Sequence, residues 1–109
     1  MTTRRAMLFS LAAVVLAGCT AHRYTVRDEM VTFSLWGPRA ERVVICSSLD
    51  GFRPHPAART SRGTWEVDLP SHAPFAYFYL VDDAAYVPDC PLSEDDEFGA
   101  KNCIFDPQL

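Results

Sequence analysis

Hydrophobic and polar residues alternate along several short segments of this chain. In segment 31–36, Val31, Phe33 and Leu35 alternate with more polar neighbours, and segment 65–69 repeats the pattern. A period of two places successive side chains on opposite faces of an extended strand. Two further runs, at 42–47 and 75–81, are rich in β-branched or aromatic residues, which suit buried strands. The pattern predicts strands at 31–36, 42–47, 65–69, 75–81 and 102–105.

Turn-forming residue pairs separate these segments, and no window carries a sustained helical period. The pairs lie at residues 37–38, 50–51, 62–63, 69–70 and 82–83. Short strands at a spacing of roughly ten residues are typical of an all-β protein that folds as an antiparallel β-sandwich. Eight prolines and an aromatic content of 12% agree with short strands interrupted by turns.

The N-terminal segment has the features of a signal peptide. Arg4 and Arg5 precede an apolar run at 6–16, which is shorter than the roughly 20 residues that span a bilayer. The small residues at 17–18 then lead directly into Cys19. This arrangement resembles the lipobox of bacterial lipoproteins, which implies lipidation of Cys19 and cleavage before it. The alternative is an ordinary secretory signal with Cys19 near the cleavage site by chance.

The predicted organisation therefore has three parts. Residues 1–18 form the lipoprotein signal peptide, 19–29 a polar tether, and 30–109 a single folded domain. Acyl chains on Cys19 would hold the domain at a membrane of the bacterial cell envelope. Thr20, and not aspartate, follows Cys19, a pattern that resembles outer-membrane lipoproteins of enteric-type bacteria. The resemblance implies a place at the outer membrane or the periplasmic face.

The charge balance excludes one class of partner. Aspartate and glutamate number 14 against 10 lysines and arginines, and two of those arginines lie in the signal peptide. Nucleic acid needs a basic face, and so does flat binding to anionic lipid. The expected membrane contact is therefore the lipid anchor, with no nucleic-acid partner.

Three cysteines remain after Cys19, so one thiol stays free. Cys46 lies in an apolar strand, whereas Cys90 and Cys103 flank an acidic loop in a chain predicted to be exported. We expect a Cys90–Cys103 disulfide, with Cys46–Cys103 as the competing pairing. The three histidines are scattered and no cysteine pair has zinc-finger spacing, so no metal site or cofactor is predicted. The acidic run at 94–97 lacks calcium-loop spacing and is interpreted as a solvated loop.

The segments at residues 33–43, 48–52, 63–67, 77–83 and 98–102 carry, in this order, a set of motifs that resembles the early-set immunoglobulin-like domains of starch and glycogen enzymes. These are the family 48 carbohydrate-binding modules and the related glycogen-binding domain of the AMP-activated protein kinase beta subunit. The matching motifs open with an aromatic-rich strand, pass through a glycine–aromatic hairpin and a Gly-x-Trp strand start, and close on a Gly-x-x-Asn strand.

The resemblance implies a carbohydrate platform. Phe52 and Tyr86 stand where glycogen-binding members have two tryptophans, and Phe78 stands at the lysine position. Asn102 matches the conserved asparagine of the motif, and Phe98 matches an apolar residue that cradles the ligand. Phe52 and Tyr86 would stack on pyranose rings while Asn102 bonds hydroxyl groups. The competing interpretation makes Phe52 and Tyr86 framework residues of the sandwich.

The predicted function is a non-catalytic module that binds α-glucan-like polysaccharide at the cell envelope. A small sandwich offers no deep cleft to hold a sugar between two carboxyl groups, and Asp82 and Asp83 occupy a turn, so no catalytic residues are predicted. The alternative is an envelope protein–protein interaction domain that kept the sandwich and lost sugar binding. An exposed aromatic patch of Phe52, Phe78 and Tyr86 would suit a protein partner as well.

Overall fold

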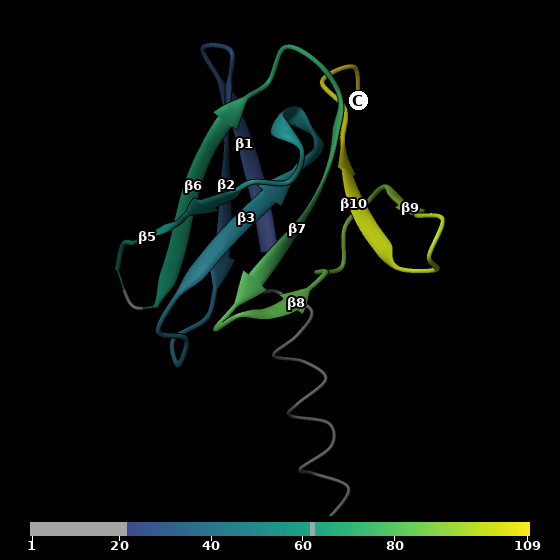
Figure 1. Cartoon of the computed structure of the whole chain (residues 1–109). Coiled ribbons are helices and arrows are strands. Elements are labelled where there is room, and N and C mark those ends of the chain that lie inside the picture. The colour runs from purple at the N-terminus through teal and green to yellow at the C-terminus, as the bar shows by residue number, and fades with distance from the viewer. Residues whose placement is uncertain (1–21, 62) are drawn as a thin grey trace, which may run out of the picture.

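The computed structural model describes residues 22–61 and 63–109, which form two antiparallel sheets around one core (Figure 1). The first sheet has the strand order β1 (His22–Arg27), β2 (Met30–Trp36), β6 (Thr64–Pro70), β5 (Ala58–Arg59). The second has the order β4 (Pro54–Pro56), β3 (Val43–Ser47), β7 (Phe75–Val81), β10 (Lys101–Phe105), β9 (Ser93–Asp95). Strand β8 (Ala84–Tyr86) also pairs with β7, and one short 3₁₀ helix, η1 (Ser48–Asp50), follows β3. The predicted β-sandwich is confirmed.

The alternation of residue types decides which face of each sheet packs inward. On β2, Val31, Phe33 and Leu35 are buried between the sheets. The polar residues between them face outward, where Thr32 Oγ1 donates a hydrogen bond of 2.6 Å to Asp68 Oδ1 on β6. A one-residue slip of register would move every apolar side chain to solvent, so the pattern fixes the pairing.

Aromatic rings from both sheets meet at the centre of the core. Phe33 of β2 lies 4.6 Å from Tyr77 of β7, measured between ring centroids, and 6.2 Å from Phe105 of β10. Phe75 completes this group at 6.1 Å from Phe33. Tilted and edge-to-face contacts of this kind add to the stabilisation from apolar burial. The second sheet is therefore held against the first mainly by rings on β7 and β10.

The predicted tether at 19–29 is wrong for its C-terminal part. Residues 22–27 form β1, which pairs with β2 over its full length. Its inward positions are occupied by His22 and Tyr24, and the Tyr24 ring lies 5.7 Å from Phe33 and 5.4 Å from Phe105. An imidazole and a phenol can fill inward positions on an edge strand because each has an apolar ring body. The folded domain thus includes residues that look polar and aperiodic in sequence.

One disulfide joins the loop before β9 to the core. Cys90 and Cys103 are bonded with a Cα–Cα separation of 5.9 Å, and Cys103 is fully buried on β10. Cys46 is a buried free thiol on β3. The chain-entropy model attributes about 3 kcal/mol of stabilisation to closing a loop of this length.

The predicted signal peptide and the lipidation site Cys19 lie outside the described residues. Within residues 22–61 and 63–109, no helix has the length and apolar character needed to cross a membrane.

Candidate functional site

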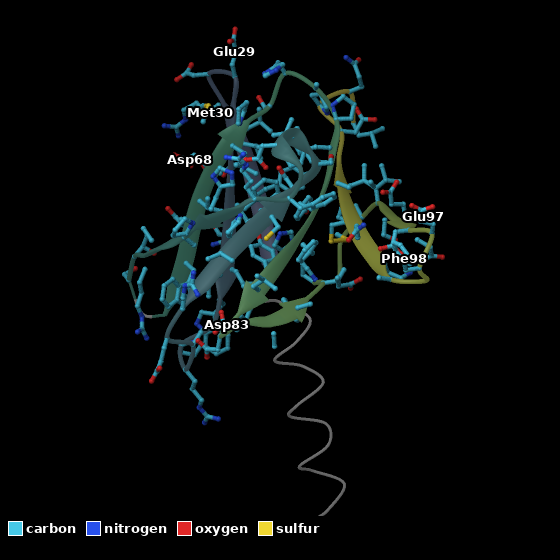
Figure 2. The ribbon with its side chains drawn as sticks, in the orientation of Figure 1. Glu29, Met30, Asp68, Asp83, Glu97 and Phe98 are labelled. Carbon is cyan, nitrogen blue, oxygen red and sulfur yellow. A yellow bond between two sulfur atoms is a disulfide. The ribbon has the colours of Figure 1, made fainter. Side chains whose placement is uncertain are left out.

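A groove with a volume of about 730 Å³ lies on the outer face of the second sheet. Its floor comes from β7 and β10, one wall from the segment after β3, and the other wall from the β9–β10 hairpin. Figure 2 shows Glu97 and Phe98 of that hairpin at the side of the sandwich, beyond β10. The lining residues that matter below are Phe52, Phe78, Glu94, Glu97, Phe98 and Asn102.

Phe52 reaches the groove through an unusual backbone conformation. Gly51 and Phe52 have φ angles of 74° and 65°, and the Phe52 N–H donates a 2.7 Å hydrogen bond to the Ser47 carbonyl. A positive φ is uncommon for a bulky residue and costs of order 1 kcal/mol or more. The turn directs the Phe52 ring against Phe78 of β7, with ring centroids 5.8 Å apart and planes inclined by 22°. Phe52 nevertheless stays 39% exposed, so one aromatic surface faces the groove.

Asp96 holds the opposite wall in shape. Its Oδ1 accepts hydrogen bonds from the backbone N–H groups of Phe98 and Ala100, at 2.8 and 2.9 Å. Backbone bonds between Asp96 and Ala100 and between Gly99 and Asp96 close the same turn. Gly99 has a φ of 85°, a conformation that glycine adopts without strain. This turn leaves the Phe98 ring 88% exposed beside the groove.

Asn102 lies at the floor between these walls. It is on β10, pairs with Glu94 of β9, and is only 8% exposed. Neighbouring Cys103 points into the core, so the alternation of the strand turns Asn102 and Ile104 toward the groove. Among the described residues, the side-chain amide of Asn102 makes no hydrogen bond, although its backbone belongs to the pairing of β10 with β9. Its donor and acceptor atoms are therefore free for a ligand.

The groove has one sign of charge. Glu94, Asp96 and Glu97 line it, whereas none of its lining residues is Lys, Arg or His. Carboxylates accept hydrogen bonds from hydroxyl groups and repel anions. The electrostatics therefore favour a neutral, hydroxyl-bearing ligand over a phosphorylated, sulfated or uronic polymer.

Tyr86 does not belong to this groove, which corrects the predicted site. Asp82 and Asp83 form a two-residue turn with φ angles of 50° and 70°, so β8 folds back on β7 with Tyr86 opposite Tyr79. Tyr79 points into the core, and paired residues share a face. Tyr86 therefore packs on the inner side, near Leu35, Trp36 and Val81.

The structure brings three of the four predicted carbohydrate-binding residues together and places Tyr86 elsewhere. Phe52, Phe98 and Asn102 come together in the groove, and Phe78 joins them as the stacking partner of Phe52. Sequence reasoning did not include Glu94, Asp96 and Glu97 among the site residues. The pairing of β9 with β10 brings these acids to the groove. The Asp-x-Phe-Gly sequence at 96–99 is the local signal for this turn, because a side-chain acceptor and a glycine favour a tight loop.

The Asp82 carboxylate makes hydrogen bonds that hold the backbone of a neighbouring loop. Its Oδ1 accepts hydrogen bonds from the backbone N–H groups of Glu41 and Arg42, at 2.9 and 2.8 Å. In the described part of the chain, no three His, Cys, Asp or Glu side chains are grouped so that they could hold a metal ion.

Comparisons with known proteins identify the fold. No family model and no curated protein matches the chain. Among solved structures, the catalytic module of SpuA, a glycogen-degrading pneumococcal virulence factor, matches with a TM-score of 0.55 at 18% identity over 77% of this chain. A pullulanase from Anoxybacillus sp. LM18-11, complexed with maltotetraose, matches with 0.53 at 18% over 76%. The GBS pullulanase SAP, also with maltotetraose, matches with 0.52 at 18% over 78%.

This chain spans only 16%, 13% and 14% of those three chains. The likeness therefore concerns one small part of each larger protein. This chain shares its β-sandwich fold with a segment of a glycogen-degrading enzyme and of two pullulanases.

Proposed function

We propose that this chain is a non-catalytic, carbohydrate-binding module that takes neutral, α-glucan-like chains in the groove on its second sheet. The observation that carries the proposal is the meeting of Phe52, Phe98 and the hydrogen-bonding amide of Asn102 in one acidic groove. A pyranose ring has an apolar C–H face and a rim of hydroxyl groups. Aromatic rings bury the face, and amide and carboxylate groups bond the rim.

Each part of the groove has a role in this proposal. The Phe52–Phe78 pair and the Phe98 ring offer stacking surfaces on opposite walls. Asn102 both donates to and accepts from sugar hydroxyls, while Glu94 and Glu97 accept from them. The likeness in fold to segments of enzymes seen with maltotetraose supports an α-linked glucan as the first ligand to test.

The proposal includes anchoring at the bacterial cell envelope. Its support is the lipobox-like sequence that ends at Cys19. Acyl chains would hold the module at the membrane without a transmembrane segment. Its activity would then be to keep polysaccharide near the cell surface.

Phe98→Ala is expected to weaken maltotetraose binding about 5- to 10-fold, since one aromatic contact contributes about 1 kcal/mol. Isothermal titration calorimetry of residues 20–109 measures this loss. Leu109→Ala is the matched control, because Leu109 is an apolar residue of similar exposure, 84%, outside the groove. Equal affinities of the two variants would remove Phe98 from the site, and a folded domain that binds no neutral glucan would contradict the proposal.

Tyr86→Ala is expected to separate stability from binding. The variant should lose about 2 kcal/mol of folding free energy, since Tyr86 packs against the core. Affinity of the folded variant for maltotetraose should equal that of the wild type. Urea denaturation and calorimetry on one preparation test both statements. A drop in affinity comparable to that of Phe98→Ala would return Tyr86 to the binding site.

A protein ligand is the second candidate, and the 88% exposure of Phe98 favours it. An exposed ring at the tip of a hairpin is a suitable anchor for a pocket on a partner. Capture of one envelope protein that depends on Phe98, together with no glucan binding, would select this alternative.

A further inference from the structure

Trp36 and the first described residue, His22, lie at the same end of the sandwich. His22 pairs with Leu35, the neighbour of Trp36. Only Thr20 and Ala21 separate His22 from Cys19. Three peptide units span at most about 11 Å when extended. A lipid attached to Cys19 would therefore be tethered to this end of the molecule.

This end also exposes an apolar surface, which we name the Trp36 surface. It consists of Trp36, Pro38, Val81 and Tyr86, and the Trp36 ring is 48% exposed. The Asp83 turn lies beside it, while Glu29 and Met30 mark the opposite end of the sandwich (Figure 2). Phe98 lies at the side, so the groove and the Trp36 surface are separate.

We infer that the Trp36 surface rests on the lipid bilayer, with the Trp36 indole in the headgroup region. The inference rests on the proposed anchoring through Cys19. Tryptophan and tyrosine are the side chains that favour the membrane–water interface, because each combines an apolar ring with a polar atom. The short segment between Cys19 and His22 would also keep the Trp36 surface at a high local concentration near the lipid. Burial of a small apolar area would then be enough to hold the surface on the bilayer.

The charged side chains at this end bear on whether the surface would prefer anionic or zwitterionic lipid. Arg42 pairs with Asp83 at 3.0 Å, and Arg59 donates a 2.8 Å hydrogen bond to the Pro38 carbonyl. The charged residues at this end are Arg39, Arg42 and Arg59 against Glu41, Asp82 and Asp83. With acids and bases in equal number, the charges at this end give no net attraction for anionic lipid. Contact with the bilayer would then depend on the rings of Trp36 and Tyr86, so the surface should bind zwitterionic and anionic vesicles equally well. The groove would then point along or away from the membrane, open to polysaccharide.

Fluorescence quenching tests the inference on the full chain, produced in a bacterium that matures lipoproteins and reconstituted into vesicles. The chain has two tryptophans, and Trp65 is buried with its Nε1 bonded to the Gly37 carbonyl. Brominated phosphatidylcholine should quench the wild type strongly. Trp36→Phe, which retains only the buried Trp65, should be quenched much less than the wild type. A Phe98→Trp substitution in that background places a reporter at the groove and should also be quenched much less.

Replacing half of the phosphatidylcholine with phosphatidylglycerol should leave the quenching unchanged. Two failures can be distinguished. Vesicle-bound, acylated wild type without quenching would overturn the inferred orientation and leave the anchor in place. Mass spectrometry that finds no acyl group on Cys19 would overturn the anchor and the orientation together, and binding of maltotetraose would still be open to its own test.

Discussion

Phe33→Ala is expected to destabilise the domain by about 4 kcal/mol, a large share of the stability of a small domain. Phe33 is fully buried and its ring contacts rings from three other strands of both sheets. Truncation would remove these contacts and leave a cavity that the rigid strands around it cannot fill. The midpoint of urea denaturation of residues 20–109 measures the loss.

Phe98→Ala provides the matched comparison for that experiment. It removes the same atoms from a side chain that is 88% exposed, so the change in stability should stay below about 0.5 kcal/mol. Similar losses for Phe33→Ala and Phe98→Ala would contradict the placement of Phe33 at the centre of the core. A Phe33→Leu variant, which keeps most of the volume, gives an intermediate value if Phe33→Ala does not fold.

Acidification from pH 7 to pH 4 is expected to cost the domain about 1 to 3 kcal/mol through His22, because solvent partly screens this half-buried ring. Burial lowers the pKa of His22 from 6.5 to about 4. Between these values the unfolded chain binds a proton that the folded chain does not bind. Stability from this group is therefore complete above pH 6.5 and is lost as the pH falls toward 4.

The surroundings of His22 explain the sign of this effect. Its ring lies among Phe33, Tyr77 and Tyr79, at centroid distances of 5.5 to 6.0 Å. Its Nε2 and the two phenol oxygens are buried, and none has a hydrogen-bond partner among the described residues. Burial also raises the pKa of Tyr77 and Tyr79, so both stay neutral over this range. In an imidazolium ion there, the proton on Nε2 would have no hydrogen-bond acceptor among the described residues.

His22→Gln isolates this contribution, because glutamine does not titrate. Denaturation at a series of pH values should give wild-type and His22→Gln curves that differ in slope between pH 4 and 6.5. Asp50, whose pKa is lowered by its hydrogen bond to His55, contributes at lower pH and equally in both proteins. Parallel curves across that interval would show that His22 is solvated in the folded state.

The strands with aliphatic or aromatic alternation were predictable, and the polar edge strand was not. β2, β6 and β7 lie where the period-two pattern placed them. β1 escaped because its inward positions carry His22 and Tyr24, which a hydrophobicity pattern scores as polar or ambiguous. Strands β4, β5 and β9 have two or three residues, too few to show any period.

Three of the four predicted carbohydrate-binding residues, Phe52, Phe98 and Asn102, lie in the groove, and they reach it in different ways. Phe98 and Asn102 are four residues apart on one hairpin, so local structure brings them together. Phe52 joins them only through the pairing of β3, β7 and β10, which is a long-range property. The misplaced Tyr86 was avoidable, because a two-residue turn at 82–83 fixes the face of every residue in β8.

The buried free thiol of Cys46 provides a chemical measure of local opening of the folded domain. Its sulfur is sheltered on β3, and burial together with the neighbouring Asp50 carboxylate raises the pKa of the thiol. Alkylating reagents attack thiolates that solvent can reach. Cys46 pairs with Phe78 and shares its outward face, so the rate at which iodoacetamide labels Cys46 would report how often the chain that covers this face of the second sheet moves away.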